Sequence, residues 1–146
     1  MSSPQDHLQS LRQLNELAAF NRWCGIEVLE VLEAESGRVV IAMDWRPEVS
    51  QYVGFMHAGV VGALIDTACG YAAATMLGQN LLASHFSVNC LRPAVGERFT
   101  ARARVVKPGR SQVFTACELF ASAKGKESLV ATGETLLTVV SSDAKA

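Results

Sequence analysis

One carboxylate stands alone in the most apolar stretch of this chain. Residues 57–77, HAGVVGALIDTACGYAAATML, are a long apolar helix candidate with Asp66 in the middle. An unpaired buried charge is costly, so this carboxylate needs either a polar partner or a chemical task. Gly62 and Gly70 lie one helical turn before and after it. Because glycine in a helix costs about 1 kcal/mol relative to alanine, we expect another backbone or a ligand to approach here, which places Asp66 at a contact surface.

Hydrophobic periodicity predicts the elements that must position this helix. Ser3 and Pro4 suit a helix start, and apolar residues recur at helical spacing from Leu8 to about Asn21. This predicts one amphipathic helix, packed on the body of the domain or at a site entrance. Strand-like runs with turn residues between them follow, two before the central helix and four after it. They are residues 26–35, 38–45, Leu82–Leu91, Arg98–Val106, Gln112–Ala121 and Ser128–Val140.

This order of elements indicates an α+β domain in which an antiparallel sheet wraps one buried helix. The central helix, from Ala58 to Leu77, would be about 30 Å long at 1.5 Å per residue, the breadth of a small domain. We expect the domain to occupy residues 23–140. An extra N-terminal helix in residues 1–22 would precede it, and a frayed tail, residues 141–146, would follow.

Composition excludes several classes of function. The chain has 146 residues, 49% hydrophobic and 18% charged, which fits one soluble globular domain. Its net charge of −1 comes from well-mixed charges, so we expect neither nucleic acid nor an anionic membrane as a partner. The first residues lack the pattern of a secretory signal. Asp66 and the glycines around it favour a core helix over a membrane span.

The cysteines occur singly, with no CxxC pair and no histidine at metal-ligand spacing, so we expect no zinc site and no cofactor. Each falls within an apolar run, where a thiol behaves as a small hydrophobic side chain. Unpaired cysteines of this kind are typical of a reducing cytoplasm. They are Cys24, Cys69, Cys90 and Cys117.

Three segments resemble one known family. GFMHAGVVGALIDTACGYAA is similar to the HGG…D segment of the hotdog-fold acyl-CoA thioesterases of the phenylacetate-pathway (PaaI-like) family. SVNCLRPA resembles that family's strand ending in an Arg-Pro turn, and VVKPGRSQVFTACELF resembles its next hairpin. The separation of His57 and Asp66 is the most specific element. The resemblance implies a hotdog fold and a homodimer with joined sheets and two active sites at the subunit interface. Many relatives pair such dimers into tetramers.

The resemblance assigns Asp66 as the general base or nucleophile acting on a thioester carbonyl, and the helix N-terminus as the oxyanion hole. Physical chemistry supports both roles. First-turn N–H groups have no internal acceptor and suit an oxygen that becomes negative, with Ala58 the first candidate donor and Gly59 the next. An ionised Asp66 needs a water or the thioester carbon within reach. A structural aspartate remains the alternative, and His57 could orient the loop, bond a backbone carbonyl or contact substrate.

The chain departs from the family pattern at several positions. Ala58 stands where the family generally has the first glycine, which keeps the backbone donor and adds a methyl group. Gln51 aligns with an asparagine that helps place the carbonyl or the water, although a solvated loop glutamine is a close alternative. Ala83 replaces a hydroxyl residue, and the adjacent Ser84, a candidate substrate contact, points to the opposite face of the strand. His85 replaces an acidic residue.

CoA carries phosphates, which favour basic side chains and turn amides, and arginine can grip a phosphate with two bonds. Taken singly, the candidates are ordinary solvated turn residues, but their clustering at strand ends favours phosphate binding. These candidates are Arg92, Lys107, Gly109 and Arg110. The acyl group needs an apolar pocket, built from residues that could equally be plain core. They are Phe55, Met56, Tyr71, Trp23 and the first helix.

Three functions from different classes follow. The first is hydrolysis of an acyl-CoA or acyl-carrier thioester with Asp66 as the acting group. The second is hydration or dehydration of a CoA-bound acyl chain, which hotdog relatives perform with a histidine and an acidic residue. The third is a non-catalytic acyl-binding module, because a fold does not fix its chemistry. His57 and Asp66 lack the motif expected of a hydratase, which argues against the second function, and the retained carboxylate argues against the third.

Overall fold

The computed structural model describes residues 2–33, 35–78 and 80–141. Its helices are α1 (Pro4–Leu17), α2 (Ala19–Cys24) and α3 (Ala58–Leu77), with a short 3-10 turn, η1 (Pro47–Val49), before α3. Its strands are β1 (Glu27–Glu33), β2 (Arg38–Asp44), β3 (Leu81–Cys90), β4 (Arg98–Lys107), β5 (Gln112–Ala123) and β6 (Lys126–Val139). Residues 142–146 of the expected tail lie outside the described residues.

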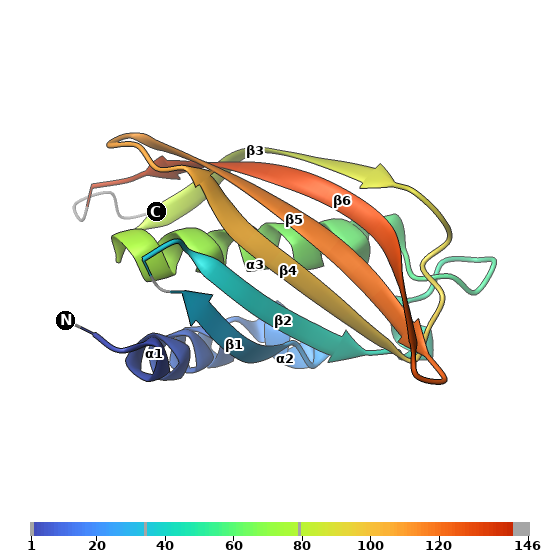
Figure 1. Cartoon of the computed structure of the whole chain (residues 1–146). Coiled ribbons are helices and arrows are strands. Elements are labelled where there is room, and N and C mark those ends of the chain that lie inside the picture. Colours follow the sequence, from blue (N-terminus) through green and yellow to red (C-terminus); the bar gives the residue numbers. More distant parts are fainter. Residues whose placement is uncertain (1, 34, 79, 142–146) are drawn as a thin grey trace.

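The six strands form one antiparallel sheet in the order β1-β2-β4-β5-β6-β3. The sheet curves around α3, which touches β2, β4, β5, β6 and β3 (Figure 1). This is the predicted hotdog architecture, and the α+β prediction is confirmed. The sheet is open, with β1 at one edge and β3 at the other.

The core lies between α3 and the concave face of the sheet. Leu64, Ile65, Ala68 and Cys69 of α3 have no exposed surface, and Phe99 faces them from β4. The alternation predicted for the strands places one side chain in two in this core, as β5 shows most regularly. α3 is long and apolar enough to cross a bilayer, but 56% of its most apolar window is buried inside the protein. The sheet therefore accounts for the apolar character of the helix.

The N-terminal segment differs from the single helix predicted up to Asn21. Ser3 and Asp6 form the capping box expected at its start, but α1 ends at Leu17 and Ala18 is extended before α2 begins. On one continuous helix, Asn15 and Asn21 would point about 120° apart. The break lets both buried side chains meet, with Nδ2 of Asn21 donating to Oδ1 of Asn15 at 3.0 Å. A tertiary contact therefore overrides the local periodicity.

One prediction about the cysteines is wrong. Cys24, Cys69 and Cys117 are buried as expected of small hydrophobic side chains, but Cys90 is exposed at the end of β3. The reason is that β3 is an edge strand, with eight of its ten residues exposed. All four thiols are unpaired.

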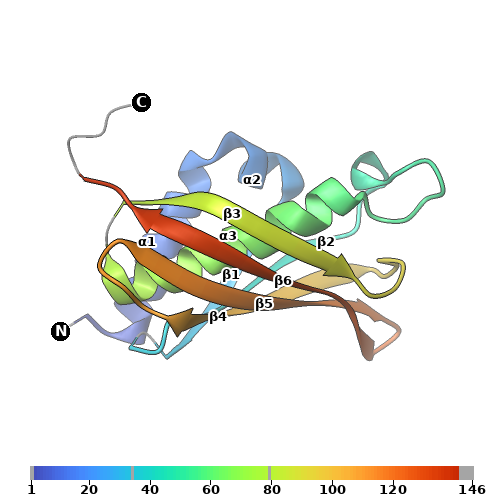
Figure 2. The same ribbon diagram turned by 90° about the horizontal axis from the view of Figure 1, so that it is seen from above.

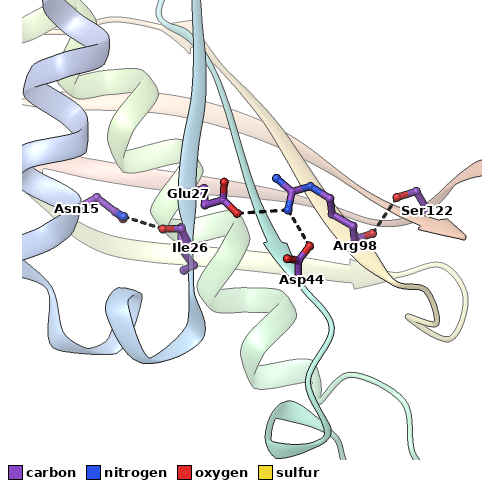
Figure 3. A network of polar contacts seen from close by, with 6 residues as sticks. All are labelled: Asn15, Ile26, Glu27, Asp44, Arg98 and Ser122. Atoms are coloured by element: carbon purple, nitrogen blue, oxygen red, sulfur yellow. Dashed lines mark hydrogen bonds and ion pairs between the residues drawn. The ribbon is translucent and has the colours of Figure 1, made fainter. Parts of the chain in front are cut away.

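Polar contacts at the opposite edge hold β1 and α1 in place (Figure 3). Arg98 of β4 pairs with Asp44 at 2.7 Å and with Glu27 at 3.3 Å, so one guanidinium joins three strands. Asn15 of α1 donates to the carbonyl of Ile26 at 2.8 Å. Exposed ion pairs contribute little individually, so the buried Asn15 contact is the stronger link between α1 and the sheet.

Candidate active site

Asp66 faces a groove that runs over α3 between the N-terminal helices and β3. The groove has a volume of about 560 Å³, and residues of α1, α2, α3, β3 and β6 line it. Figure 2 shows α3 lying between α2 on one side and the β3 edge of the sheet on the other. The carboxylate predicted to lie at a contact surface therefore opens onto a cavity.

The surroundings of Asp66 are unusually apolar for a carboxylate. The side chain is half-buried, and burial raises its pKa above the ordinary aspartate value. Within the described part of the chain, no charge or hydrogen-bond donor offsets this effect. A raised carboxyl pKa in a cavity is typical of a group that accepts a proton.

The two glycines beside Asp66 have different surroundings. A Cβ on Gly62 would lie 3.3 Å from the Phe86 ring of β3, so this glycine lets the edge strand pack close to the helix. A Cβ on Gly70 would meet nothing within 4 Å, because Gly70 lies in the wall of the groove. The group that approaches Gly62 is therefore a side chain rather than the expected backbone, whereas Gly70 faces open space.

The first turn of α3 leaves one amide without an acceptor. His57 is the N-cap residue, and its Nδ1 accepts a hydrogen bond from the N–H of Gly59 at 2.8 Å. The amides of Val60 and Val61 donate to the carbonyl of His57. Among the described residues, nothing accepts from the N–H of Ala58. The N–H of Gly59, the second candidate donor, is therefore not free, because it already donates to His57. The N–H of Ala58 remains available.

Ala58 opens into a second hollow of about 440 Å³, which also contains Gln51, Phe55 and Arg92. Four residues predicted for the site on separate grounds therefore lie together. The side-chain oxygen of Gln51 accepts from the amides of Val53 and Phe55 and holds the loop before α3. This loop projects beyond the start of the helix (Figure 2).

The two hollows are separate on one chain. Asp66 lines the first, Ala58 lines the second, and neither residue lines both. They are eight positions apart on α3, which is about 12 Å along the helix axis. Attack on a carbonyl needs the attacking atom about 3–3.5 Å from the carbon and the oxyanion donors about 3 Å from the oxygen. One carbonyl therefore cannot use both groups of the same chain.

The structure does not bring the predicted phosphate collectors together on one chain. Arg92 follows the end of β3, whereas Lys107, Gly109 and Arg110 lie at or after the end of β4, at the opposite end of the sheet. A Cβ on Gly109 would collide with the Gln112 carbonyl, so the close packing of this turn explains why the residue is glycine. The strand directions thus separate residues that the sequence suggested as one cluster.

Ser84 lies outside the Asp66 groove. It falls at a register shift between Ala83 and His85, and its hydroxyl donates to the carbonyl of Leu136 at 3.2 Å. Ala83, not Ser84, lines the groove, as the alternation of strand residues predicts. His85 borders a different hollow together with Lys107 and residues of β5 and β6. Ser84 and His85 are therefore not neighbours of Asp66.

Sequence reasoning missed a buried polar triad that supports one wall of the groove. The hydroxyl of Tyr71 donates to Oδ1 of Asn15 at 2.8 Å, and Nδ2 of Asn21 donates to both, at 3.0 Å each. The triad fixes α1 and α2 against α3. The signal was present, because Asn15 interrupts the apolar face that Leu8 and Leu11 begin. Over residues 2–33, 35–78 and 80–141, no three metal-ligating side chains lie together.

Comparisons with known proteins identify relatives that share this fold. A family model described as the thioesterase superfamily matches residues 53–128, slightly more than half of the chain. The crystal structure of a thioesterase family protein from Silicibacter pomeroyi is 34% identical, with a TM-score of 0.86, and the match covers 92% of this chain and 98% of that one. The PaaI protein of the E. coli phenylacetic acid degradation operon shares the fold, with 23% identity, a TM-score of 0.83 and coverage of 96% and 97%.

Among curated proteins, human acyl-coenzyme A thioesterase 13 is 28% identical over 131 residues. This match covers 86% of the chain and 91% of the human protein. The matched family segment includes α3, and therefore Asp66 and the free amide of Ala58.

Proposed function

Because this chain belongs to the thioesterase superfamily and is a thioester hydrolase, we propose that it hydrolyses acyl-CoA at active sites shared by two copies of the chain. The similarity to acyl-coenzyme A thioesterase 13 supports acyl-CoA as the substrate class. One observation carries the shared site: the carboxylate of Asp66 and the free amide of Ala58 open into separate hollows about 12 Å apart along α3.

In the proposed reaction, Asp66 of one protomer and the Ala58 amide of its partner act on one thioester. The partner's Ala58 donates to the carbonyl oxygen, which becomes negative as the carbon is attacked. Asp66 takes a proton from the attacking water, or attacks the carbon itself. The bond between carbon and sulfur then breaks, and the thiolate leaves and is protonated. Attack by water gives the acid directly, whereas attack by Asp66 gives an anhydride, which a water molecule then hydrolyses to the acid and free Asp66. Gln51 lines the same hollow as the free amide, and its side-chain NH₂ would help place the carbonyl.

The edge strand β3 is the surface on which the second copy would pair. Its outer edge carries unpaired backbone groups, and Phe86 and Leu82 are 50% and 62% exposed. Antiparallel pairing of two β3 strands would join the sheets about a two-fold axis. It would also bring Arg92 of one protomer toward the Lys107–Arg110 end of its partner, which would reunite the phosphate collectors.

We place this enzyme in the cytoplasm, because four unpaired cysteines fit a reducing compartment. Pairing of two dimers into a tetramer stays a prediction. In this assembly His57 caps α3 through its Nδ1, and its N–H donates to the carbonyl of Val49, which ties the loop before α3 to the helix start. Its Nδ1 is occupied by the Gly59 amide, which favours hydrolysis over the hydratase chemistry that needs a histidine as a proton carrier.

The substrate class is tested by thiol release from a panel of acyl-CoAs, read with a thiol reagent. We expect turnover of at least one member with stoichiometric free acid. Enoyl-CoAs in the same panel report hydration through loss of the enoyl absorbance. Loss of that absorbance without thiol release would replace this proposal with the hydratase, and no reaction with any acyl-CoA would remove CoA thioesters as substrates.

The shared site predicts that the wild-type chain sediments at no less than twice its 15.7 kDa mass. Two phenylalanines of similar exposure provide a matched test of the interface. Phe86→Lys on β3 (50% exposed) should dissociate the dimer and abolish activity, because it places a charge in the pairing edge. Phe114→Lys on the far face of β5 (47% exposed) should leave the dimer and its activity intact. A fully active monomer would contradict the shared site.

A further inference from the structure

The Asp66 groove changes character along α3. Beyond Asp66 and Thr67 its walls carry leucines from three elements: Leu14 and Leu17 of α1, Leu81 and Leu82 of β3, and Leu137 of β6. Leu17 is 80% exposed and Leu82 is 62% exposed in a single chain. Leucines gathered around one open groove are typical of a binding site for an apolar ligand.

The wall that α3 contributes to this groove has almost no side-chain bulk. Gly70 and Ala74 follow Asp66 at one-turn intervals. A methyl group added at Gly70 would find open space for 4 Å around it, whereas the Phe86 ring fills the space in front of Gly62. Open volume therefore lies on one side of Asp66, toward the C-terminal end of α3.

The length of this path sets the size of the ligand. Asp66 and Ala74 are eight positions apart, which is about 12 Å of helix. An extended chain of about eight to ten carbon atoms has this length. The leucine walls offer no charge and few hydrogen-bond partners along it.

We propose that the acyl group of the substrate is an unbranched aliphatic chain of medium length that lies along α3 from Asp66 to Ala74, and that Gly70 determines how long a chain is accepted. This inference rests on the proposed thioesterase function and adds the acyl class and the specificity-determining residue. Gly70 acts by its lack of a side chain, so it contacts the chain beyond the reacting carbonyl and takes no part in the chemistry.

A series of straight-chain acyl-CoAs from C2 to C12, together with phenylacetyl-CoA, tests the acyl class. Each buried methylene contributes about a threefold to fourfold gain in kcat/KM. We therefore expect kcat/KM to rise by roughly a hundredfold from C4 to C8, and to level off near C10 where the groove ends. Phenylacetyl-CoA should be hydrolysed less efficiently than octanoyl-CoA.

Substitution of Gly70 tests the residue. Gly70→Leu should lower the ratio of kcat/KM for octanoyl-CoA to kcat/KM for butyryl-CoA by at least about tenfold, because the new side chain fills the part of the groove that only the longer chain enters. Gly70→Ala should show the same trend more weakly. It should also raise the melting temperature by about 2–4 °C, because the helix gains propensity and no clash arises. A higher melting temperature would show that the lower activity on long chains does not come from unfolding.

Gly62→Ala is the matched control, with the same chemical change one turn on the other side of Asp66. Gly62→Ala should change kcat/KM by the same factor for acyl chains of every length, because its new methyl group meets Phe86 rather than the groove. A flat chain-length profile, a preference for phenylacetyl-CoA, or Gly70 variants that slow every substrate equally would overturn the inference while leaving hydrolysis intact. Failure of the proposed function would appear differently, as no hydrolysis of any acyl-CoA.

Discussion

Asp66→Asn is expected to lower kcat for acyl-CoA hydrolysis by about 10²–10⁴-fold, the range for loss of a general base, without loss of fold or dimer. The amide keeps the shape of the side chain but can neither take a proton from water nor attack the thioester carbon. Asp66 has no described hydrogen-bond partner whose loss would disturb the structure. Steady-state kinetics, circular dichroism and sedimentation on the same sample separate these effects.

A carboxylate elsewhere provides the control. Glu118 is exposed on the outer face of β5, so Glu118→Gln should keep wild-type kinetics. If Asp66→Asn retained wild-type turnover, Asp66 would be a structural residue and another group would perform the chemistry.

The same substitution has a predicted effect on stability. Burial raises the pKa of Asp66, so the folded chain holds this proton more tightly than the unfolded chain. Between the ordinary value of 3.8 and the raised value, the folded state binds more protons, and its stability falls as the pH rises through this window. Asp66→Asn should therefore melt higher than wild type at pH 7, and the difference should close as the pH approaches 4. Calorimetry at both pH values measures this.

Ala58→Pro is expected to lower kcat by about 10²–10³-fold, which is typical for loss of one oxyanion donor. Proline removes the N–H of Ala58 and nothing else that the helix uses. The first helical position tolerates proline, and the extended backbone of His57 before it (φ −59°, ψ 134°) suits a residue preceding proline. The melting temperature should therefore change little. A proline variant with full activity would exclude this amide from the oxyanion hole.

Mixing the two inactive variants tests the sharing of the site directly. When Asp66→Asn and Ala58→Pro chains are unfolded together and refolded, half of the dimers contain one chain of each kind. Each mixed dimer has one site with both groups intact, so the mixture should recover about one quarter of wild-type activity. Either variant refolded alone is the control. If each site used groups from one chain only, mixing would restore nothing.

Most of the fold could be predicted because its signals are local. Strand alternation and the apolar run around Asp66 specify a sheet and the helix that it encloses. The break at Ala18 could not be predicted in this way, since it depends on a contact between Asn15 and Asn21 that forms only after the segment packs against Tyr71. Exposure of Cys90 likewise depends on which strand lies at the edge of the sheet.

The candidate site was predictable where one residue was chemically out of place. Asp66 stood out as a charge in an apolar helix, and the structure places it in a groove. The hydrogen bond from the Gly59 N–H to Nδ1 of His57 could not be predicted from the sequence, because it requires the rotamer that places the His57 ring against the first turn of its own helix. The separation of Arg92 from Lys107 follows from strand direction, which composition does not encode.

The exposed β3 edge also has a consequence for biogenesis. A newly synthesised chain presents this unpaired strand, with Phe86 and Leu82 on it, to every other chain that emerges nearby, and such edges template aggregation. The irregular register at Ser84 shortens the regular part of that edge. A mutation that slows dimer formation leaves the β3 edge exposed for longer. It should therefore first lower the yield of soluble protein on overexpression, before the specific activity of the purified protein falls.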